Sequence, residues 1–412
     1  MSIKKYKYID KQSFNIKESK TKDKGEFSSR EDAVEEFISN LKEIHLLQQR
    51  LYAERKEGVI FVFQAMDAAG KDGTIRTVFS TLSPHGVKEF CFKAPSSEEL
   101  SHDYLWRFWS ALPAKGHISI FNRSYYEDVL IGKVHKLYEK QLVPDRIAKV
   151  DVIKKRYKEI NDFEKYLYNN GTRVVKIFLN VSKDEQAKRF ISRIDTPSKN
   201  WKISEGDIKE REFWDEYQEA FETMINNTAS KTSPWYVVPA DHKWYARLIV
   251  SRIVLKTLQE INPQFPTTSK DELDKVLSYR EELINSISDE KYKKKISKSK
   301  EENKAANIVD DNKAENKEEN STSTEVEPAN ESGSNEKTKK KDKKHNKKKD
   351  KKKKTAYDEL PDDVKEEMES VFVDSSVVVT DTIIESEQEK IEEKDGNEKT
   401  NDDEKAEVAN ES

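Results

Sequence analysis

The chain has 412 residues, of which 37% are charged, yet its formal net charge is only -4. Because opposite charges nearly cancel, the net charge points to no particular partner, and local runs of charge are more informative. The single cysteine, Cys91, excludes an intramolecular disulfide, and residues 1–24 lack the apolar segment of a secretory signal. No run of about 18 apolar residues is present. We therefore expect a cytoplasmic protein that does not span a membrane.

Aromatic residues are concentrated in one part of the chain. All six tryptophans lie between Trp106 and Trp244, and aromatic residues are sparse after Phe265. Large aromatic side chains supply much of the buried area of a core, whereas sequences of low hydrophobicity cannot offset the entropy cost of ordering. The predicted segments are a polar, extended leader (1–27), a globular domain (28–265), a charged helical extension (266–297) and a disordered tail rich in Lys, Glu and Asn (298–412).

The first long helix is predicted to begin at Ser29, a typical N-cap residue. Apolar residues then recur at spacings of three and four, which places them on one helix face: Phe37, Leu41, Ile44, Leu47 and Leu51. Gly58 follows a charged segment and is predicted to end the helix.

Five short apolar segments are predicted to be strands, at residues 59–63, 90–92, 117–121, 174–179 and 235–238. The first is continuously apolar, as expected for a strand buried on both faces of a parallel sheet. Helical patterns separate the strands, for example at 74–82 and 151–168, and a capping box at Ser204 opens another helix. This alternation indicates an α/β fold with a parallel sheet. Cys91, within the second strand, is expected to be buried and unreactive.

A candidate phosphate-binding loop follows the first strand. Its residues are Ala68, Ala69, Gly70, Lys71, Asp72 and Gly73. Small residues allow backbone N–H groups to face a phosphate, a lysine neutralises it, and a helix begins behind. The match to the strict P-loop pattern is partial, because Ala65 replaces the first glycine and Asp72 replaces the Ser or Thr. An ordinary strand-to-helix turn with a solvated lysine is the alternative.

Asp67 lies inside this loop, where a carboxylate would be repelled by bound phosphates unless a cation lay between them. Asp67 is therefore a candidate ligand for Mg²⁺, replacing the missing hydroxyl, or a base beside the acceptor phosphate.

A second polar cluster ends the strand at 117–121. Ligands bind at the carboxyl ends of the strands in open α/β sheets, so Asn122 and Arg123 are expected to face the phosphate-binding loop. Glu127 follows one turn later and is a second candidate metal ligand. The alternative for Glu127 is a solvated helix face.

A third candidate is a basic helix. Arg189 and Arg193 are four residues apart and share one helix face, and Lys199 and Lys202 follow. Guanidinium groups suit phosphate oxygens, so this helix is predicted to be a lid over a polyphosphate tail. A charged, solvated face is an equally good interpretation of the pattern.

Taken together, these segments resemble the polyphosphate kinase 2 family. The resemblance covers residues 30–260 approximately, and several ordered blocks make it far more specific than a single P-loop motif. The blocks are FQAMDAAGKDGTI (63–75), FKAPS (92–96), LWR (105–107), FNRSYYEDVL (121–130), VH (134–135), RFISR (189–193), PSKNWK (197–202) and SPW (233–235).

The resemblance implies a P-loop kinase fold related to thymidylate kinase, with a three-layer parallel sheet and a helical lid. It implies transfer of a phosphoryl group between polyphosphate and ADP, ATP or AMP, with Mg²⁺ (or Mn²⁺) as cofactor, in a homo-oligomer. The catalytic roles it implies fall on Asp67, Lys71, Asn122, Arg123, Arg189 and Arg193. Many family members have Asp where Asn122 stands. Asn122, together with Tyr125, Tyr126 and Glu127, resembles the pattern of the subgroup that uses both AMP and ADP.

Two other functions fit parts of the sequence. One is an ATP-dependent nucleotide or small-molecule kinase of the same fold, which the fold alone does not exclude. The other is a non-catalytic polyanion-binding protein, because residues 337–354 contain 13 lysines in 18 residues. That tract is predicted to contact nucleic acid or polyphosphate, or to act as a solvating segment.

Overall fold

The computed structural model describes residues 2–9, 14–141, 144–148 and 151–294. They divide into one unit that ends at Phe265 and a second that begins at Pro266. The predicted tail at 298–412, with its lysine tract at 337–354, lies outside the described residues.

A six-stranded sheet forms the centre of the first unit, in the order β1-β6-β5-β2-β4-β3. The five strands from β6 to β3 are parallel, and β1 is antiparallel to β6. The strands are β1 (Lys7–Tyr8), β2 (Gly58–Ala65), β3 (Val87–Cys91), β4 (Ile118–Asn122), β5 (Thr172–Asn180) and β6 (Trp235–Pro239). The predicted α/β fold is confirmed, and the five predicted strands are all present.

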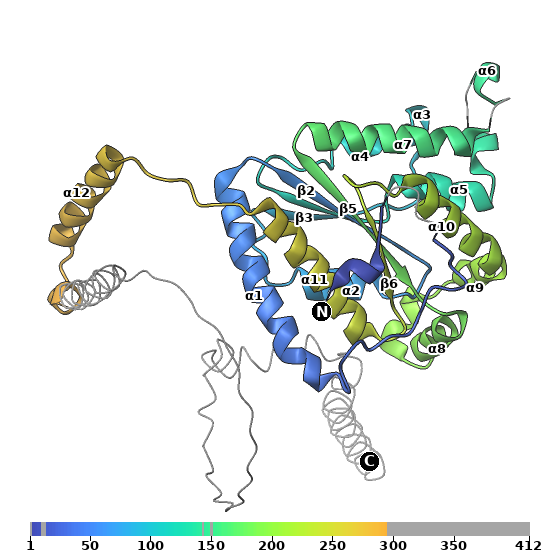
Figure 1. The fold of residues 1–412 in the computed structure, drawn as a ribbon, viewed down its shortest axis with the longest axis horizontal. Helices are drawn as coiled ribbons and strands as arrows, with labels where there is room; N and C mark the ends of the chain where they lie inside the picture. The colour runs from blue at the N-terminus through green and yellow to red at the C-terminus, as the bar shows by residue number, and fades with distance from the viewer. Residues whose placement is uncertain (1, 10–13, 142–143, 149–150, 295–412) are drawn as a thin grey trace, which may run out of the picture. The chain divides into compact units, whose positions relative to one another are not determined.

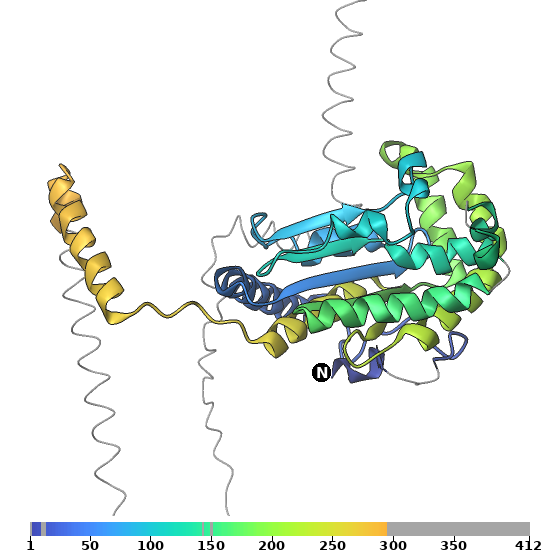
Figure 2. The same cartoon turned by 90° about the horizontal axis from the view of Figure 1, so that it is seen from above.

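Helices cover both faces of this sheet (Figures 1 and 2), which gives the three layers of the predicted fold. One layer contains α1, α2 and α11, and the other contains α7 and α10. The α-helices are α1 (Glu31–Glu54), α2 (Lys71–Val78), α3 (Ser97–Ser101), α4 (Trp106–Trp109), α5 (Ile131–Val134), α6 (Asp145–Ala148), α7 (Val152–Asn169), α8 (Lys183–Ile194), α9 (Glu205–Glu210), α10 (Trp214–Thr228), α11 (Lys243–Ile261) and α12 (Lys270–Ser286). Short 3₁₀ helices are η1 (Ile3–Tyr6), η2 (Tyr125–Val129), η3 (Leu137–Lys140), η4 (Pro197–Lys202) and η5 (Arg211–Phe213).

β2 is central because its side chains suit burial on both faces. Residues 59–63 of β2 are fully buried, and β2 pairs with β4 on one side and β5 on the other. The carboxyl ends of β2 and β4 therefore lie next to each other, as the sequence predicted for the two polar clusters that follow them.

The end of α1 differs from the prediction. The helix ends at Glu54, and Arg55 adopts the left-handed conformation (φ 55°) that terminates it. Gly58 is instead the first residue of β2, where its N–H donates to the carbonyl of Gly171 (2.9 Å). A Cβ on Gly58 would lie 3.1 Å from Cγ of Pro113. Gly58 thus permits a close approach of chain segments rather than ending the helix.

The N-terminal segment was expected to be an extended polar leader, but it packs on the core. Tyr6, Phe14 and Ile16 are buried, and β1 adds an antiparallel edge strand to β6. The Tyr6 hydroxyl lies 2.7 Å from that of Tyr245. Lysines and other polar residues separate these apolar residues in the sequence, so no periodic pattern revealed them.

The prediction that Cys91 is buried is wrong, because β3 is an edge strand and Cys91 is exposed. Its thiol donates to Glu89 Oε1 (3.4 Å). Flanking phenylalanines made this segment look like an internal strand.

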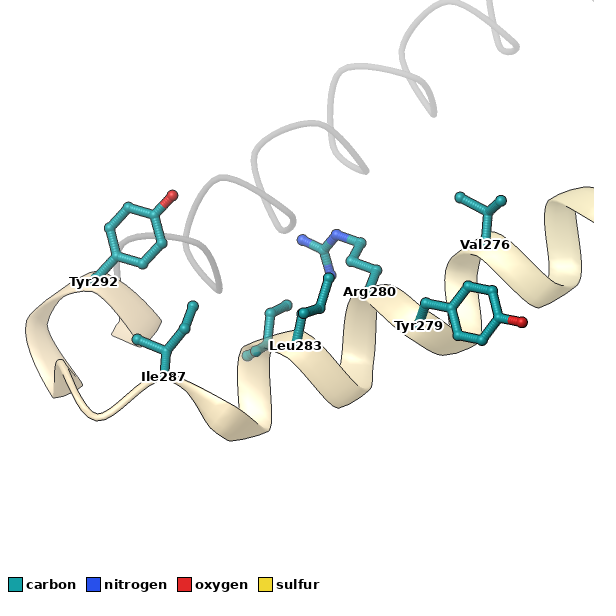
Figure 3. Close-up of a pocket in the computed structure, with 7 residues that line it drawn as sticks. Val276, Tyr279, Arg280, Leu283, Ile287 and Tyr292 are labelled. Atoms are coloured by element: carbon teal, nitrogen blue, oxygen red, sulfur yellow. The ribbon is translucent and has the colours of Figure 1, made fainter.

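The second unit contains α12, within the segment predicted to be a charged extension. A capping box formed by Ser269 and Glu272 starts this helix. Val276, Leu283 and Ile287 line an open groove along it (Figure 3). None of the helices in the described part of the chain combines the length and apolar character needed to cross a bilayer.

A fully buried ion pair joins α7 to β5. Lys176 Nζ donates to Glu164 Oε2 (2.6 Å) and to the Thr228 carbonyl (2.6 Å). The hydroxyls of Tyr125 and Tyr126 both donate to Glu164 Oε1 (2.8 Å each). Burial lowers the pKa of Lys176, and the charge of Glu164 opposes this shift. The network fixes the start of η2, which directly follows the polar cluster after β4.

Replacing Lys176 with Met should lower the free energy of unfolding by about 3 to 5 kcal/mol, because Glu164 would remain buried without its partner. Adding Glu164→Gln should recover part of this loss, since the amide is uncharged and still accepts from the tyrosines. Urea unfolding measures both, with Lys165→Met on the exposed face of α7 as control. Equal stability of the single and double variants would contradict the role of the buried charge.

Candidate active site

The loop between β2 and α2, residues 66–70, has an unusual backbone. Ala68 and Gly70 have positive φ angles of 60° and 103°. The Ala69 N–H donates to the Met66 carbonyl (3.2 Å), and the Thr74 N–H donates to the Gly70 carbonyl (3.0 Å). The N–H groups of the first turn of α2 precede this intrahelical bond and have no partner within the helix. They form a site suited to an anion such as phosphate.

Lys71 begins α2 and is buried at this site. Its Nζ donates to the Ala65 carbonyl (3.1 Å), which turns the side chain back over the β2–α2 loop. Burial lowers the pKa of Lys71, and the nearby carboxylates of Asp67 and Glu127 oppose that shift. The lysine therefore lies among groups of both charges beside the helix N-terminus, as the P-loop interpretation requires.

Asp67 and Arg123 form an ion pair across the ends of β2 and β4. Arg123 Nη2 lies 3.0 Å from Asp67 Oδ1, and both side chains are partly exposed. Arg123 has a positive φ of 64°, and its backbone N–H donates to the Phe63 carbonyl (3.1 Å). This bond extends the pairing of β2 with β4 and directs the Arg123 side chain to the β2–α2 loop, as predicted.

Glu127 lies on η2 beside this pair. The surrounding protein excludes water and raises the pKa of Glu127, while the positive charges of Arg123 and Lys71 lower it. When the Gln64 amide is oriented to satisfy both of its ends, its nitrogen donates to Glu127 Oε1 (2.7 Å). The carboxylate is thus fixed in place and does not lie on a solvated helix face.

Asp67, Arg123 and Glu127 line one cavity of about 160 Å³. Glu210 and Tyr217 form its far wall, and the Tyr217 hydroxyl donates to Glu210 Oε2 (2.7 Å). His135 Nε2 lies 2.9 Å from the same oxygen. The sequence offered no signal for Glu210, because it lies in a charged segment far from the loop motifs.

Asn122 also lies at the end of β4, but it faces a different set of side chains. Its Nδ2 donates to Asp72 Oδ1 (2.9 Å) and to Glu89 Oε1 (3.1 Å). Asp72, which replaces the usual Ser or Thr after the lysine, therefore contacts Asn122, and Asn122 faces the phosphate-binding loop as predicted.

Arg189 lies in α8, and its contacts differ from those of a phosphate-binding lid residue. Its guanidinium donates to the carbonyls of Ala68 (3.1 Å) and Ala69 (2.7 Å) and to those of Ala240 (2.6 Å) and Asp241 (3.0 Å). Its Nε donates to Glu185 Oε1 (2.9 Å). A guanidinium has five N–H donors, and all five are used within the protein.

The other basic residues of the predicted lid make contacts that differ from those of Arg189. Arg193 stacks on Phe190, with 5.7 Å between guanidinium carbon and ring centre. Lys199 and Lys202 lie on η4, and Lys202 Nζ lies over the exposed ring of Trp201. Within the described ranges, no hydrogen bond or ion pair links these three residues to the β2–α2 loop. Their predicted role as phosphate ligands stays a prediction.

A profile of the family described as Polyphosphate kinase 2 matches residues 27–266, more than half of the chain. The chain belongs to the polyphosphate kinase 2 family. The blocks quoted above, including those at the ends of β2 and β4, fall inside the matched region.

Two similar proteins and one solved structure agree with this assignment. The chain is 46% identical to an ADP-polyphosphate phosphotransferase of Rhodopseudomonas palustris, over 63% of this chain and 90% of the relative. It is 43% identical to an AMP/ADP-polyphosphate phosphotransferase of Meiothermus ruber, over 64% of this chain and 96% of the relative. The crystal structure of Polyphosphate Kinase 2 from Arthrobacter aurescens is similar, with a TM-score of 0.60 and 37% identity, over 65% of this chain and 93% of that one.

The raised pKa of Glu127 predicts a pH dependence of the activity. If Glu127 acts as a carboxylate, its contribution should be lost as pH falls through its folded-state pKa, which lies above the ordinary value of 4.5. We divide kcat/KM of the wild type by kcat/KM of Glu127→Gln at each pH. Titration of the nucleotide affects both values equally and therefore cancels in this ratio. This ratio should fall toward one before pH 4.5 is reached. A ratio that stays constant down to that pH would contradict the prediction.

Proposed function

We propose that this chain transfers a phosphoryl group between inorganic polyphosphate and adenine nucleotides, from polyphosphate to ADP and also to AMP. Its family membership and the names of the two relatives support the substrates. The observation that carries the mechanism is the position of Lys71, the first residue of α2, among Asp67, Arg123 and Glu127. Those three residues line one small cavity. Two cations and a helix N-terminus thus lie close together, as a transferring phosphoryl group requires.

Phosphoryl transfer needs mainly positioning and charge neutralisation. In our proposal the N–H groups of the first turn of α2 bind phosphate oxygens, and Lys71 neutralises the charge that develops on the transferred group. Arg123 binds a second phosphate at the end of β4. Its ion pair with Asp67 (3.0 Å) keeps the guanidinium directed to the loop.

The residues present fit a Mg²⁺ ion. Asp67 and Glu127 present two carboxylates to one cavity next to a phosphate site, and Mg²⁺ is usually bound by one or two carboxylates together with phosphates and water. Mn²⁺ has the same ligand preference. The metal would neutralise phosphate charge when bound, and Asp67 and Glu127 would orient it.

Two further properties are proposed with this function. A single cysteine and a catalytic requirement for nucleotides are in keeping with a cytoplasmic location. We also propose self-association, which analytical ultracentrifugation of the full chain would test.

The two other candidate functions make different predictions. An ATP-dependent kinase of the same fold would use ATP in preference to polyphosphate as donor. A non-catalytic polyanion-binding protein would catalyse no phosphoryl transfer. The Asp67–Arg123 ion pair and the buried Lys71 argue against this function. Deleting residues 298–412 tests the second function directly, because the proposed enzyme keeps its turnover without them.

Replacing Lys71 with Ala should lower turnover of ADP with polyphosphate at least about a hundredfold, the scale of losing one preorganised electrostatic contact. The wild type should prefer polyphosphate to ATP as donor in the same assay. Lys88→Ala, an exposed lysine on β3, is the matched control. Near-wild-type turnover of Lys71→Ala would remove this lysine from the mechanism, and a preference for ATP would favour the rival kinase.

Asn122→Asp tests the use of AMP. The new carboxylate would lie within hydrogen-bond reach of Asp72 and Glu89, and the added charge should lower the use of AMP relative to ADP several-fold. Steady-state kinetics with each acceptor measure the ratio, and Asn122→Ser, which adds no charge, is the control. An unchanged ratio in Asn122→Asp would leave Asn122 without a role in specificity.

A further inference from the structure

Helix α8 contacts three successive carbonyls of the β2–α2 loop. Gln186 Nε2 donates to the Asp67 carbonyl (2.9 Å). One turn further along α8, Arg189 donates to the carbonyls of Ala68 and Ala69. Both side chains are buried, so these bonds form in a region with little competing water.

The direction of these carbonyls determines the direction of the loop N–H groups. In a trans peptide unit the N–H points opposite to the C=O. Because the carbonyls of residues 67–69 point to α8, the N–H groups of residues 68–70 point away from it. The Ala69 N–H is used within the loop. The others join the N–H groups of the first turn of α2 on the side away from α8.

The β2–α2 loop needs stabilising contacts to keep its backbone conformation. Ala68 has a φ of 60°, and the left-handed region is unfavourable for residues with a Cβ. At Gly70 a φ of 103° carries no such cost, and a Cβ there would lie 3.6 Å from Arg189 Nη1. The bonds to the carbonyls of Asp67, Ala68 and Ala69 therefore stabilise a conformation that the sequence disfavours at Ala68.

Gln186 and Arg189 are themselves fixed from other directions. The second guanidinium nitrogen of Arg189 donates to carbonyls at the end of β6, those of Ala240 and Asp241. Arg211 of η5 donates to Gln186 Oε1 (2.8 Å) and to the Lys183 carbonyl (2.8 Å). The two side chains thus connect the β2–α2 loop to β6 and to the segment that contains α9 and η5.

We propose that Gln186 and Arg189, together the anchoring pair, are positioning residues that hold the loop N–H groups toward the phosphate. This inference rests on the proposed phosphate-binding role of the loop. It assigns Arg189 a role other than the phosphate ligand that the sequence pattern suggested. If Arg189 moved to bind phosphate, four carbonyls would lose a charged donor.

Gln186→Leu gives the sharpest test, because it removes the hydrogen bond to the Asp67 carbonyl, and the one from Arg211, without removing a charge. We expect kcat to fall by up to roughly tenfold while KM for polyphosphate changes less than about twofold, since one hydrogen bond between neutral groups is worth up to about that factor. Arg189→Lys keeps the charge but not the fork of donors, and it should also lower kcat. Combining the two should cost less than the product of the single effects.

Salt dependence separates positioning from phosphate binding. Arg189→Gln removes the charge as well as the fork of donors. Under the proposal its slope of log KM against log salt should equal that of the wild type, because no phosphate contact is lost. Lys188→Ala, an exposed lysine on α8, controls for the charge of the helix and should leave kcat unchanged. A raised KM with unchanged kcat in Arg189→Lys, together with a shallower slope in Arg189→Gln, would make Arg189 a phosphate ligand and overturn the proposal.

Hydrogen–deuterium exchange gives a readout that does not depend on activity. In Gln186→Leu, the peptide that contains residues 64–73 should exchange faster, and peptides from β5 and α11 should be unchanged. Wild-type exchange in that peptide together with wild-type kcat would also overturn the proposal. Full activity of Lys71→Ala would instead refute the phosphate-binding role of the loop, and the exchange result would still report on the anchoring pair.

Discussion

The hydrogen bonds from α8 to three successive carbonyls of the β2–α2 loop determine what this site presents to a ligand. A peptide unit is planar, so the direction of its carbonyl fixes the direction of its N–H. Gln186 and Arg189 bind the carbonyls on one side of the loop, and the N–H groups are left on the other. The proposed anion binding by the loop therefore depends on a helix more than a hundred residues further along the chain.

Balance of charge is the second constraint on the site. Lys71 and Arg123 lie beside Asp67 and Glu127. Burial lowers the pKa of Lys71 and raises that of Glu127, and the neighbouring opposite charges oppose both shifts. Without the carboxylates, two buried or half-buried cations would repel each other. A phosphate chain with its metal ion carries both negative and positive charge. A site with both cations and carboxylates therefore suits such a substrate better than it suits a bare anion. The fold contributes by ending β2 and β4 side by side.

Much of this arrangement could be predicted from the sequence. Two sequence patterns indicated the fold: the apolar strand before Lys71 and the polar residues after the strand at 117–121. They also predicted that Asp67, Lys71, Arg123 and Glu127 lie at one edge of the sheet. Their signals are local, because each lies within a few residues of a strand end. Neighbouring strands in a parallel sheet then place them at one edge.

The remaining features depend on contacts between distant segments. Arg189 and Arg193 look equivalent in the sequence, yet all five donors of Arg189 bind protein groups and Arg193 stacks on Phe190. Cys91 lies on an edge strand because of the strand order, which no local pattern encodes. Gln186 carries no motif, since its partner is a backbone carbonyl and any sequence supplies one. Tertiary position, not residue type, decides these roles.

A crystal structure of the full chain with polyphosphate, ADP and Mg²⁺ would test the account most directly. We predict phosphate oxygens within hydrogen-bond distance of the N–H groups of the first turn of α2 and of Lys71 Nζ. The guanidinium of Arg189 should keep its bonds to the carbonyls of Ala68 and Ala69. A phosphate bound to Arg189, with those carbonyl bonds broken, would contradict the account.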